Sequence, residues 1–381
     1  MDKRINNILA KETDRQHQTV ELIASENFAS EAVMQLAGSV FTNKYAEGYP
    51  GKRYYNGCEH MDEIEQLAID TLCELYGANY ANVQPHCGAN ANTAIYLAFL
   101  EPEDRILGMD LASGGHLSHG ALVNISGKVY DAYHYGVDEA GWLDYDAIQA
   151  QALEVQPKMI VAGASAYPRK IDFERFRAIA DSVGAYLLVD MAHYSGLIAG
   201  AAYPSPVQYA DFVTSTTHKT LRGPRGGIIL WNNPDYTRKI NSAIFPGTQG
   251  GPLMNIIAAK AQAFVEANDP DFRHYACRVI ENAQEMCAVF NQNGIKVLTG
   301  GTDSHIILID LSESKYSGRE AADLLEANDI TVNKNGVPND PRSFVETSGI
   351  RIGTAAETTR GHDKEWFNDL ALKICHLLNG Q

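Results

Sequence analysis

The chain has 381 residues, 45% of them hydrophobic and 20% charged, so we expect a globular protein of two domains. A net charge of −16 argues against a protein that binds nucleic acid or anionic membranes nonspecifically. The six cysteines show no paired spacing, the N-terminus lacks a signal sequence and no apolar run reaches transmembrane length. These features predict a soluble, cytoplasmic protein.

Helices and short apolar strands alternate along the first 270 residues. Apolar residues recur at helical spacing over 61–75, and an acidic residue opens a second helical stretch over 172–183. Strands that alternate with helices predict a mostly parallel sheet covered on both faces, which is the α/β class. The expected strands are 105–109, 159–162, 186–190, 211–214 and 227–231.

The pattern changes near residue 270. A long helix at 275–292 precedes expected strands at 295–298 and 305–311, and helices follow at 318–327 and 364–378. Strands and helices in this order predict a smaller α+β domain. We therefore divide the chain into an N-terminal helical arm (1–24), a large domain (25–270) and a small C-terminal domain (271–381).

Two neighbouring segments carry most of the chemistry. Residues 214–227 set Lys219 among hydroxyls, a histidine and glycines, whose backbone N–H groups can approach an anion. Asp190 ends an apolar run where α/β proteins bind ligands, although an aspartate there could equally cap a helix. Pyridoxal phosphate needs a lysine for covalent attachment, an acid for its ring nitrogen and donors for its phosphate.

Four further segments are weaker signals. Residues 86–92 form a small-residue turn before a helix, which suits a phosphate. The segment 114–119 holds two histidines without an evident third ligand, so stacking on an aromatic cofactor is favoured over zinc. The aromatic loop 45–55 could serve a site or a subunit contact. Arg351, on a short strand, would pair with a carboxylate of the protein or of a ligand.

Together these segments resemble serine hydroxymethyltransferase, a family of pyridoxal-phosphate enzymes of fold type I. The resemblance covers nearly the whole chain. It implies a mostly parallel central sheet in a large domain, a smaller C-terminal α+β domain, pyridoxal 5′-phosphate as cofactor and tetrahydrofolate as co-substrate. It also implies an obligate homodimer, or a tetramer in which two dimers pair, with shared active sites. The motifs that carry it are 21–27, 43–55, 161–169, 245–252 and 349–354.

The resemblance implies a cofactor role for each matching residue. Lys219 would bind the cofactor covalently, Asp190 would pair with the ring nitrogen, and His116 would stack on the ring. Ser165 and His193 would bond the side of the ring that carries the hydroxyl. The phosphate would be held by the following residues, the last two from the neighbouring subunit: Cys87, Gly88, Ala89, His218, Gly250 and Gly251.

The substrate sites are implied in the same way, and no metal is expected. Arg351 would clamp the substrate carboxylate with help from Ser25. Glu47 would act as acid or base near the serine hydroxyl. The remaining contacts would come from Tyr45 to the cofactor, Tyr55 to the substrate, and Tyr54 and Asn335 to the folate. The three tyrosines, with Glu47 on the same loop, would reach the site from the second subunit.

Several positions depart from the family pattern. Cys87 replaces a serine, and sulfur is a poor hydrogen-bond donor. Three further positions carry residues that are uncommon in the family: Asn56, Asn255 and Ala355. These departures bear on folate affinity and substrate choice. A folate-independent β-hydroxy amino acid aldolase and an α-methylserine hydroxymethyltransferase are therefore alternatives, and a binding protein without turnover is a third.

Overall fold

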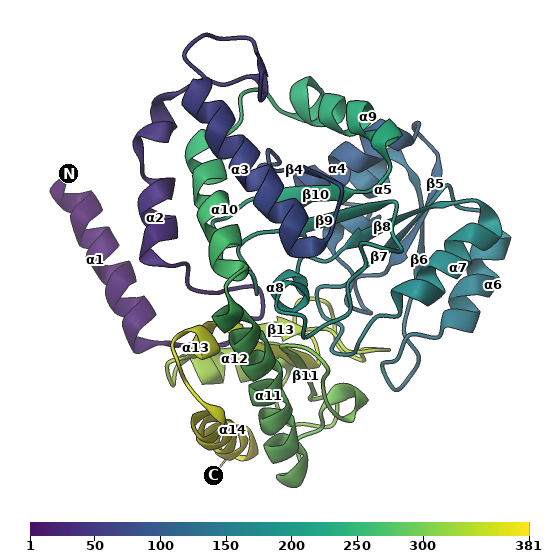
Figure 1. Cartoon of the computed structure of the whole chain (residues 1–381). Coiled ribbons are helices and arrows are strands. Elements are labelled where there is room, and N and C mark those ends of the chain that lie inside the picture. The colour runs from purple at the N-terminus through teal and green to yellow at the C-terminus, as the bar shows by residue number, and fades with distance from the viewer. Residues whose placement is uncertain (381) are drawn as a thin grey trace.

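The computed structural model describes residues 1–380, and within them a seven-stranded sheet forms the centre of the larger part (Figure 1). The strand order is β4-β10-β9-β8-β7-β5-β6, and β10 runs antiparallel to β4 and β9, whereas all other neighbouring pairs are parallel. The mostly parallel sheet is thus confirmed. The strands are β4 (Tyr80–Asn82), β5 (Arg105–Met109), β6 (Asp131–Tyr135), β7 (Met159–Ala162), β8 (Tyr186–Asp190), β9 (Phe212–Thr216) and β10 (Gly227–Trp231).

Apolar side chains cover both faces of this sheet. Along β8, Leu187 and Val189 join one hydrophobic cluster, whereas Leu188 joins a second cluster on the opposite face. Helices pack on both faces, including α4 against β9 and β10 and α7 against β7 and β8. The helices of this part are α2 (Glu31–Ala37), α3 (Glu59–Tyr76), α4 (Gly88–Phe99), α5 (Ile125–Val129), α6 (Tyr145–Val155), α7 (Phe173–Val183), α8 (Ser195–Ala199), α9 (Thr237–Ser242) and α10 (Met254–Ala267).

The C-terminal part surrounds a small antiparallel sheet in the order β11-β14-β13. Residues from Ala283 to Leu378, together with Leu22, form a hydrophobic cluster of their own. This separate cluster supports the domain division near residue 270, which remains a prediction. The elements are α11 (Pro270–Gln292), β11 (Ile306–Asp310), α12 (Gly318–Glu326), β12 (Ile330–Thr331), β13 (Asn333–Asn335), β14 (Gly349–Gly353), α13 (Ala355–Thr359) and α14 (Lys364–Asn379).

The N-terminal segment links α1 (Lys3–Gln18) to the small sheet region. All residues of α1 are exposed, and the helix lies at the periphery of the molecule (Figure 1). The following strand β1 (Val20–Glu21) pairs in parallel with β12. Among the helices of residues 1–380, none has the length and apolar character that crossing a membrane requires.

Two expectations from the sequence are corrected. Residues 295–298 were expected to form a strand, but Val297 makes an isolated bridge to Ile309, and a 3₁₀ turn follows. A positive φ of 60° at Thr299 turns the chain away from the sheet. The helix expected at 275 begins at Pro270, because Asp269 caps it and proline is favoured in the first turn.

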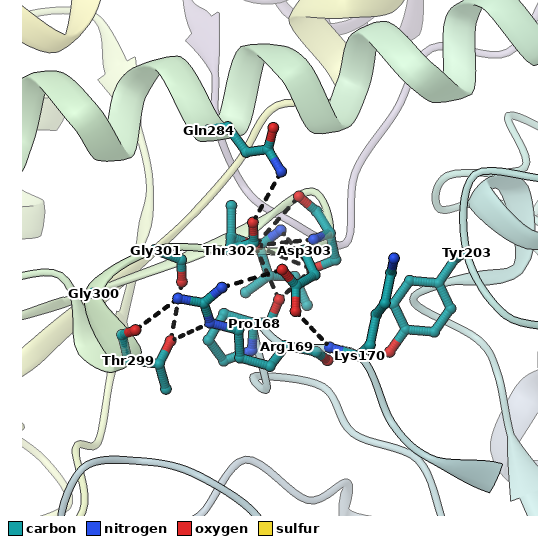
Figure 2. A network of polar contacts seen from close by, with 12 residues as sticks. Pro168, Arg169, Lys170, Tyr203, Gln284, Thr299, Gly300, Gly301, Thr302 and Asp303 are labelled. Atoms are coloured by element: carbon teal, nitrogen blue, oxygen red, sulfur yellow. Dashed lines mark hydrogen bonds and ion pairs between the residues drawn. The ribbon is translucent and has the colours of Figure 1, made fainter. Parts of the chain in front are cut away.

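A polar network connects the loop after β7 with the loop before β11 (Figure 2). Arg169 forms an ion pair with Asp303 at 3.1 Å and donates to the backbone carbonyl of Thr299 at 2.6 Å. The backbone N–H of Asp303 donates to the carbonyl of Pro168 at 3.0 Å. These bonds fix the C-terminal part against the central sheet beside the site described next.

Candidate functional site

A cavity of about 300 Å³ lies at the carboxyl end of the central sheet. Asp190 ends β8, Thr216 ends β9, and Gly88 opens α4, so three elements bring their ends to one place. The residues that line the cavity are Gly88, Ala89, His116, His119, Ala164, Ser165, Asp190, Ala192, His193, Thr216 and Lys219.

The Asp190 carboxylate is buried and held ionised. Its Oδ2 accepts from Asn92 at 2.8 Å and contacts Nε2 of His119 at 3.1 Å, and its Oδ1 accepts from the N–H of Ala192 at 3.0 Å. Burial alone would raise the pKa of this carboxyl, but the hydrogen bonds from His119 and Asn92 hold the pKa below its ordinary value. A carboxylate offers about four lone-pair sites, so one remains for a donor in the cavity.

The two histidines of the 114–119 segment have defined proton positions. Nδ1 of His116 accepts from the N–H of Ser118 at 3.1 Å, and Nδ1 of His119 accepts from the N–H of His116 at 3.3 Å. Each neutral ring therefore carries its proton on Nε2. Burial lowers the pKa of His116 to about 4, which keeps this ring neutral.

These proton positions bear on the zinc alternative. The sequence showed no third ligand, but the structure brings Asp190 to His116 and His119, with ligand atoms within 4.8 Å of one another. However, His119 uses its Nε2–H on Asp190, and a metal ligand would need that nitrogen unprotonated. The hydrogen bonds therefore run from the backbone N–H of His116 through the His119 ring to Asp190, and they support the Asp190 carboxylate.

Lys219 is the ionisable amine of the cavity. The residue is 8% exposed, and its backbone carbonyl is fixed by Asn27 at 2.9 Å. Burial lowers the pKa of Lys219 to about 8, opposed by Asp190 and assisted by the cations Arg351 and Arg225. A lysine whose pKa approaches neutrality supplies the free amine that a nucleophile requires.

A second buried lysine, Lys260 on α10, is bound differently. Its Nζ donates to the carbonyls of Val83 at 2.6 Å, Gly227 at 2.8 Å and Pro85 at 3.1 Å. These three bonds use all three ammonium protons. Lys260 therefore anchors the turn before α4 to β10, whereas Lys219 faces the cavity.

The N-terminus of α4 offers backbone donors at one end of the cavity. Cys87 occupies the N-cap position of α4, followed by Gly88 and Ala89. A Cβ on Gly88 would lie 2.8 Å from a methyl carbon of Thr216, so only glycine fits here. The hydroxyl of Thr216 and Nδ1 of His218 are buried without a hydrogen-bond partner among residues 1–380. Thr216 lines the cavity beside the start of α4, where an unpaired hydroxyl suits an anion, whereas His218 is not among the lining residues.

Arg351 approaches the cavity from β14. Its Nε donates to Asn333 at 3.0 Å and its Nη1 to the carbonyl of Ser165 at 2.5 Å. Burial lowers its pKa to about 10, and among residues 1–380 no carboxylate forms an ion pair with it. Ala24, the neighbour of Ser25, lies against Gly353 on the same strand. The structure thus brings Arg351, Ser165 and the Ser25 segment together.

Other predicted site residues form a second group, which we call the tyrosine loop cluster: Tyr45, Glu47, Tyr54, Tyr55, Phe245, Gly250 and Gly251. The rings of Tyr45 and Tyr55 are 5.3 Å apart, and those of Tyr54 and Phe245 are 5.6 Å apart. The charge of Glu47 raises the pKa of Tyr45. A Cβ on Gly250 would lie 3.6 Å from a carboxylate oxygen of Glu47. The three tyrosines are 47–74% exposed, and this cluster lies outside the lining of the Lys219 cavity.

A buried ion pair holds the loop of this cluster in place. Arg53 bonds Glu65 at 2.6 Å and Asp62 at 2.8 Å, both on α3. The same guanidinium donates to the carbonyls of Ala46 and Gly48 on either side of Glu47. The loop is therefore fixed to α3 although its tyrosines are exposed.

Asn335 lies in a different cavity of about 240 Å³, together with Ser113, Tyr167 and Leu308. Its side-chain amide donates to the carbonyl of Gly336 at 2.7 Å. The loop 164–168 contributes to both cavities, so Asn335 is a neighbour of the Lys219 cavity rather than part of its lining.

The sequence reasoning missed several residues that shape the site. Asn92 lies in the segment 86–92 and His119 in the segment 114–119, both of which the sequence analysis names. Asn92 could have been recognised as a polar residue on an otherwise apolar helix. Thr216 was noted only as context for Lys219. His305, which contacts His193, lies 112 residues from it, and its position could not be deduced from spacing.

The chain is similar to known proteins along nearly its whole length. The family model described as serine hydroxymethyltransferase matches residues 1–374. The chain is 58% identical over 371 residues to serine hydroxymethyltransferase 2 of Pseudomonas fluorescens, which covers 97% of this chain and 89% of that protein. It is 56% identical over 380 residues to the serine hydroxymethyltransferase of a Wolbachia from Drosophila simulans, with 100% and 89% covered. The chain therefore belongs to the serine hydroxymethyltransferase family, whose enzymes have fold type I.

Proposed function

We propose that this protein catalyses the reversible conversion of serine and tetrahydrofolate to glycine and 5,10-methylenetetrahydrofolate, with pyridoxal 5′-phosphate as cofactor. The observation that carries the proposal is the pairing of two groups in one cavity. Lys219 supplies an amine whose pKa is lowered to about 8, and Asp190 supplies an ionised carboxylate. Family membership and the names of the relatives support the same reaction.

The residues present fit this cofactor. Lys219 would hold it covalently through Nζ, and the remaining lone pair of Asp190 would accept the ring N–H. The phosphate would take the donors at Gly88 and Ala89 together with Thr216 and His218, whose side-chain atoms are otherwise unpaired among residues 1–380. The cysteine at position 87 adds little, because a thiol donates weakly.

The remaining steps belong to side chains of this protein. When bound, pyridoxal phosphate supplies an electron sink for charge that develops at the substrate Cα. Arg351 would bind the substrate carboxylate with two N–H donors, and Ser25 would add a hydroxyl. Glu47 would take the proton from the serine β-hydroxyl, and His116 would pack its neutral ring against the cofactor.

We also propose that the active unit is a homodimer. Every residue for which we expect a role in the neighbouring subunit falls in the exposed tyrosine loop cluster, away from the Lys219 cavity. A second copy could insert this cluster beside the cavity, which would bring Glu47, Gly250 and Gly251 to the ligand. We infer a cytoplasmic location from the six free thiols, which suit a reducing compartment.

The attachment point is tested by borohydride reduction and peptide mapping of the wild-type protein. We expect the cofactor mass on the peptide that contains Lys219, and unmodified Lys260 serves as the internal control because it is equally buried. The proposed role of Lys219 would be refuted if the cofactor mass were found on Lys260. It would also be refuted if borohydride attached no cofactor to the wild-type protein.

The reaction is tested by serine cleavage with and without tetrahydrofolate. We expect turnover of serine to require the folate. Equal rates with and without it would favour a β-hydroxy amino acid aldolase, and faster turnover of α-methylserine than of serine would favour the other alternative. Catalytic turnover of any of these substrates would exclude a binding protein.

A further inference from the structure

His305 is a buried histidine that lies directly behind the cavity wall. Its Nε2 is 3.3 Å from Nδ1 of His193, and the two rings are nearly parallel, with 16° between their planes and 5.5 Å between their centroids. His193 lines the cavity, whereas His305 is fully buried at the start of β11. His305 can therefore influence a ligand through His193.

The contacts of His305 define where its proton lies. Its Nε2 is 3.1 Å from the backbone carbonyl of Ala24, and a carbonyl oxygen can only accept. Its Nδ1 is buried without a hydrogen-bond partner among residues 1–380, which fits an unprotonated nitrogen better than a stranded donor. Burial lowers the pKa of His305 to about 3, although the bond to Ala24 opposes this effect, so the ring is neutral.

The proton of His193 follows from this arrangement. Its Nδ1 faces the same Nε2–H of His305 that donates to Ala24, so the two acceptors share this proton in a three-centre hydrogen bond, and Nδ1 of His193 accepts. Burial and the nearby cations Lys219 and Arg351 hold the pKa of His193 well below its ordinary value, so this ring is neutral as well. A neutral imidazole with an accepting Nδ1 carries its proton on Nε2, at the opposite edge of the ring. His193 thus presents a hydrogen-bond donor rather than an acceptor at the cavity.

We propose that His305 is a positioning residue that holds His193 as its Nε2–H tautomer and links that tautomer to the N-terminal segment. The consequence for turnover rests on the function proposed above, whereas the tautomer itself can be measured without it. Ala24 precedes Ser25 and packs on Gly353 of β14, the strand that carries Arg351. His305 therefore connects the segments that would bind the substrate carboxylate with the histidine that would face the cofactor.

The fold fixes His305 from both sides. The preceding loop is anchored by Arg169 and Asp303 in the network of Figure 2. The hydroxyl of Ser304 donates to the carbonyl of Pro168 at 3.2 Å, and the N–H of Ile306 donates to that hydroxyl at 3.2 Å. From Ile306 the chain enters β11 and pairs with β14. A ring held in this way is suited to setting the orientation of its neighbour.

The tautomer is tested on the cofactor-free protein with ring-¹⁵N histidine and solid-state NMR. The His193 signals are assigned by their loss in His193→Gln. We expect an unprotonated Nδ1 and a protonated Nε2 in the wild type, and a mixture of tautomers in His305→Leu. His305→Gln should restore the wild-type pattern, because its amide N–H can replace the Nε2–H. His362→Leu is the control, since His362 stacks on Trp366 in the C-terminal part.

The same variants are then assayed as holoenzymes. We expect His305→Leu to lower kcat/KM for serine about tenfold, the lower end of the effect of losing a partner that orients a site histidine. The absorption maximum of the bound cofactor and its pH dependence should shift as well, whereas His305→Gln should stay near wild type. An unchanged His193 spectrum in His305→Leu would overturn the inference, and so would His305→Gln as impaired as His305→Leu. A wild type without serine turnover would refute the proposed function, and the NMR spectra of the cofactor-free protein would still decide which tautomer His193 adopts.

Discussion

The side-chain amide of Asn92 donates a hydrogen bond of 2.8 Å to the Asp190 carboxylate. The orientation of the amide is fixed, because its oxygen accepts from the Thr214 hydroxyl at 2.5 Å and its nitrogen also donates to Ser118. Asn92 lies on α4, Asp190 ends β8 and Thr214 lies on β9. One buried amide therefore joins three elements around the acid that would hold the cofactor ring.

Replacing Asn92 with leucine should weaken cofactor binding. The change keeps the branched outline of the side chain but removes a hydrogen bond to a charged group, which is worth about 1.5–3 kcal/mol, or roughly a ten- to hundredfold increase in Kd. Equilibrium dialysis of the cofactor measures the effect. Asn282→Leu is the control, because that buried amide bonds Thr358 in the C-terminal part. Equal losses in both variants would mean that Asn92 acts through general stability.

Arg351→Ala should raise the KM for serine while the cofactor stays bound. Its partners within residues 1–380 are neutral oxygens, so its charge is available for a ligand carboxylate. Truncating one partner of a buried charge pair costs about 2–4 kcal/mol, which corresponds to an increase of roughly thirty- to thousandfold. Steady-state kinetics and cofactor absorbance separate the two effects. Arg351→Lys keeps the charge but should recover little, because it lacks the bidentate geometry. An unchanged KM in Arg351→Ala would assign this residue a structural role.

The two buried lysines should affect stability in opposite directions. Lys219 has a pKa of about 8 in the folded protein against an ordinary value of 10.5, so burying its charge costs about 3 kcal/mol below pH 8. Lys219→Met should therefore raise the Tm of the cofactor-free protein at pH 7. Burial also lowers the pKa of Lys260, to about 7, but Lys260→Met leaves three buried carbonyls without their donor and should therefore lower the Tm.

The pH dependence of this gain has a defined sign. Between pH 8 and 10.5 the unfolded chain holds the Lys219 proton and the folded chain does not, so wild-type stability rises over this window. The advantage of Lys219→Met should therefore shrink as the pH rises from 8 towards 10.5. Differential scanning calorimetry of the cofactor-free proteins at pH 7 and 10 measures it. A gain that is constant with pH would show that charge burial is not its cause.

The sequence predicted the sheet best where strands are buried on both faces. Strand β8 has the expected bounds 186–190, because an apolar run between polar turns is typical of a central parallel strand. Strand β6 was missed, since it lies at the sheet edge and alternates exposed and buried residues. The sequence also predicted helix α7 with Asp172 at its start. The structure shows Asp172 as the N-cap, whose side chain accepts from the N–H of Arg175.

The site was predictable where one segment carries the signal. Lys219 and Asp190 stand at strand ends, and the structure places both in one cavity as expected. The partners of Asp190 and His193 could not be predicted from the sequence. Asn92 lies 98 residues from Asp190 along the chain, and His305 lies 112 residues from His193. Which polar residue meets which depends on how the helices and loops pack, and local patterns do not contain that information.

The last prediction concerns Glu47, which lies in the tyrosine loop cluster outside the Lys219 cavity. Glu47→Gln should reduce folate-dependent serine turnover about 10²-fold or more, the scale for losing an acid or base. Cleavage of allothreonine should fall much less, because its aldehyde product leaves without folate. The ratio of the two losses is measured with purified protein, and equal losses would favour the aldolase alternative.

Subunit exchange tests where Glu47 acts. Glu47→Gln and Lys219→Ala proteins are each inactive by this reasoning, but a mixed dimer would contain one site with both an intact lysine and an intact glutamate. Mixing the two under conditions that exchange subunits should therefore restore up to about a quarter of wild-type activity, since half of the dimers are mixed and each has one complete site. The matched control mixes Lys219→Ala with the double variant, in which no complete site can form. Absence of restoration in the test mixture despite exchange would place Glu47 in the site of its own chain, whereas restoration in the control would show that activity does not require Lys219.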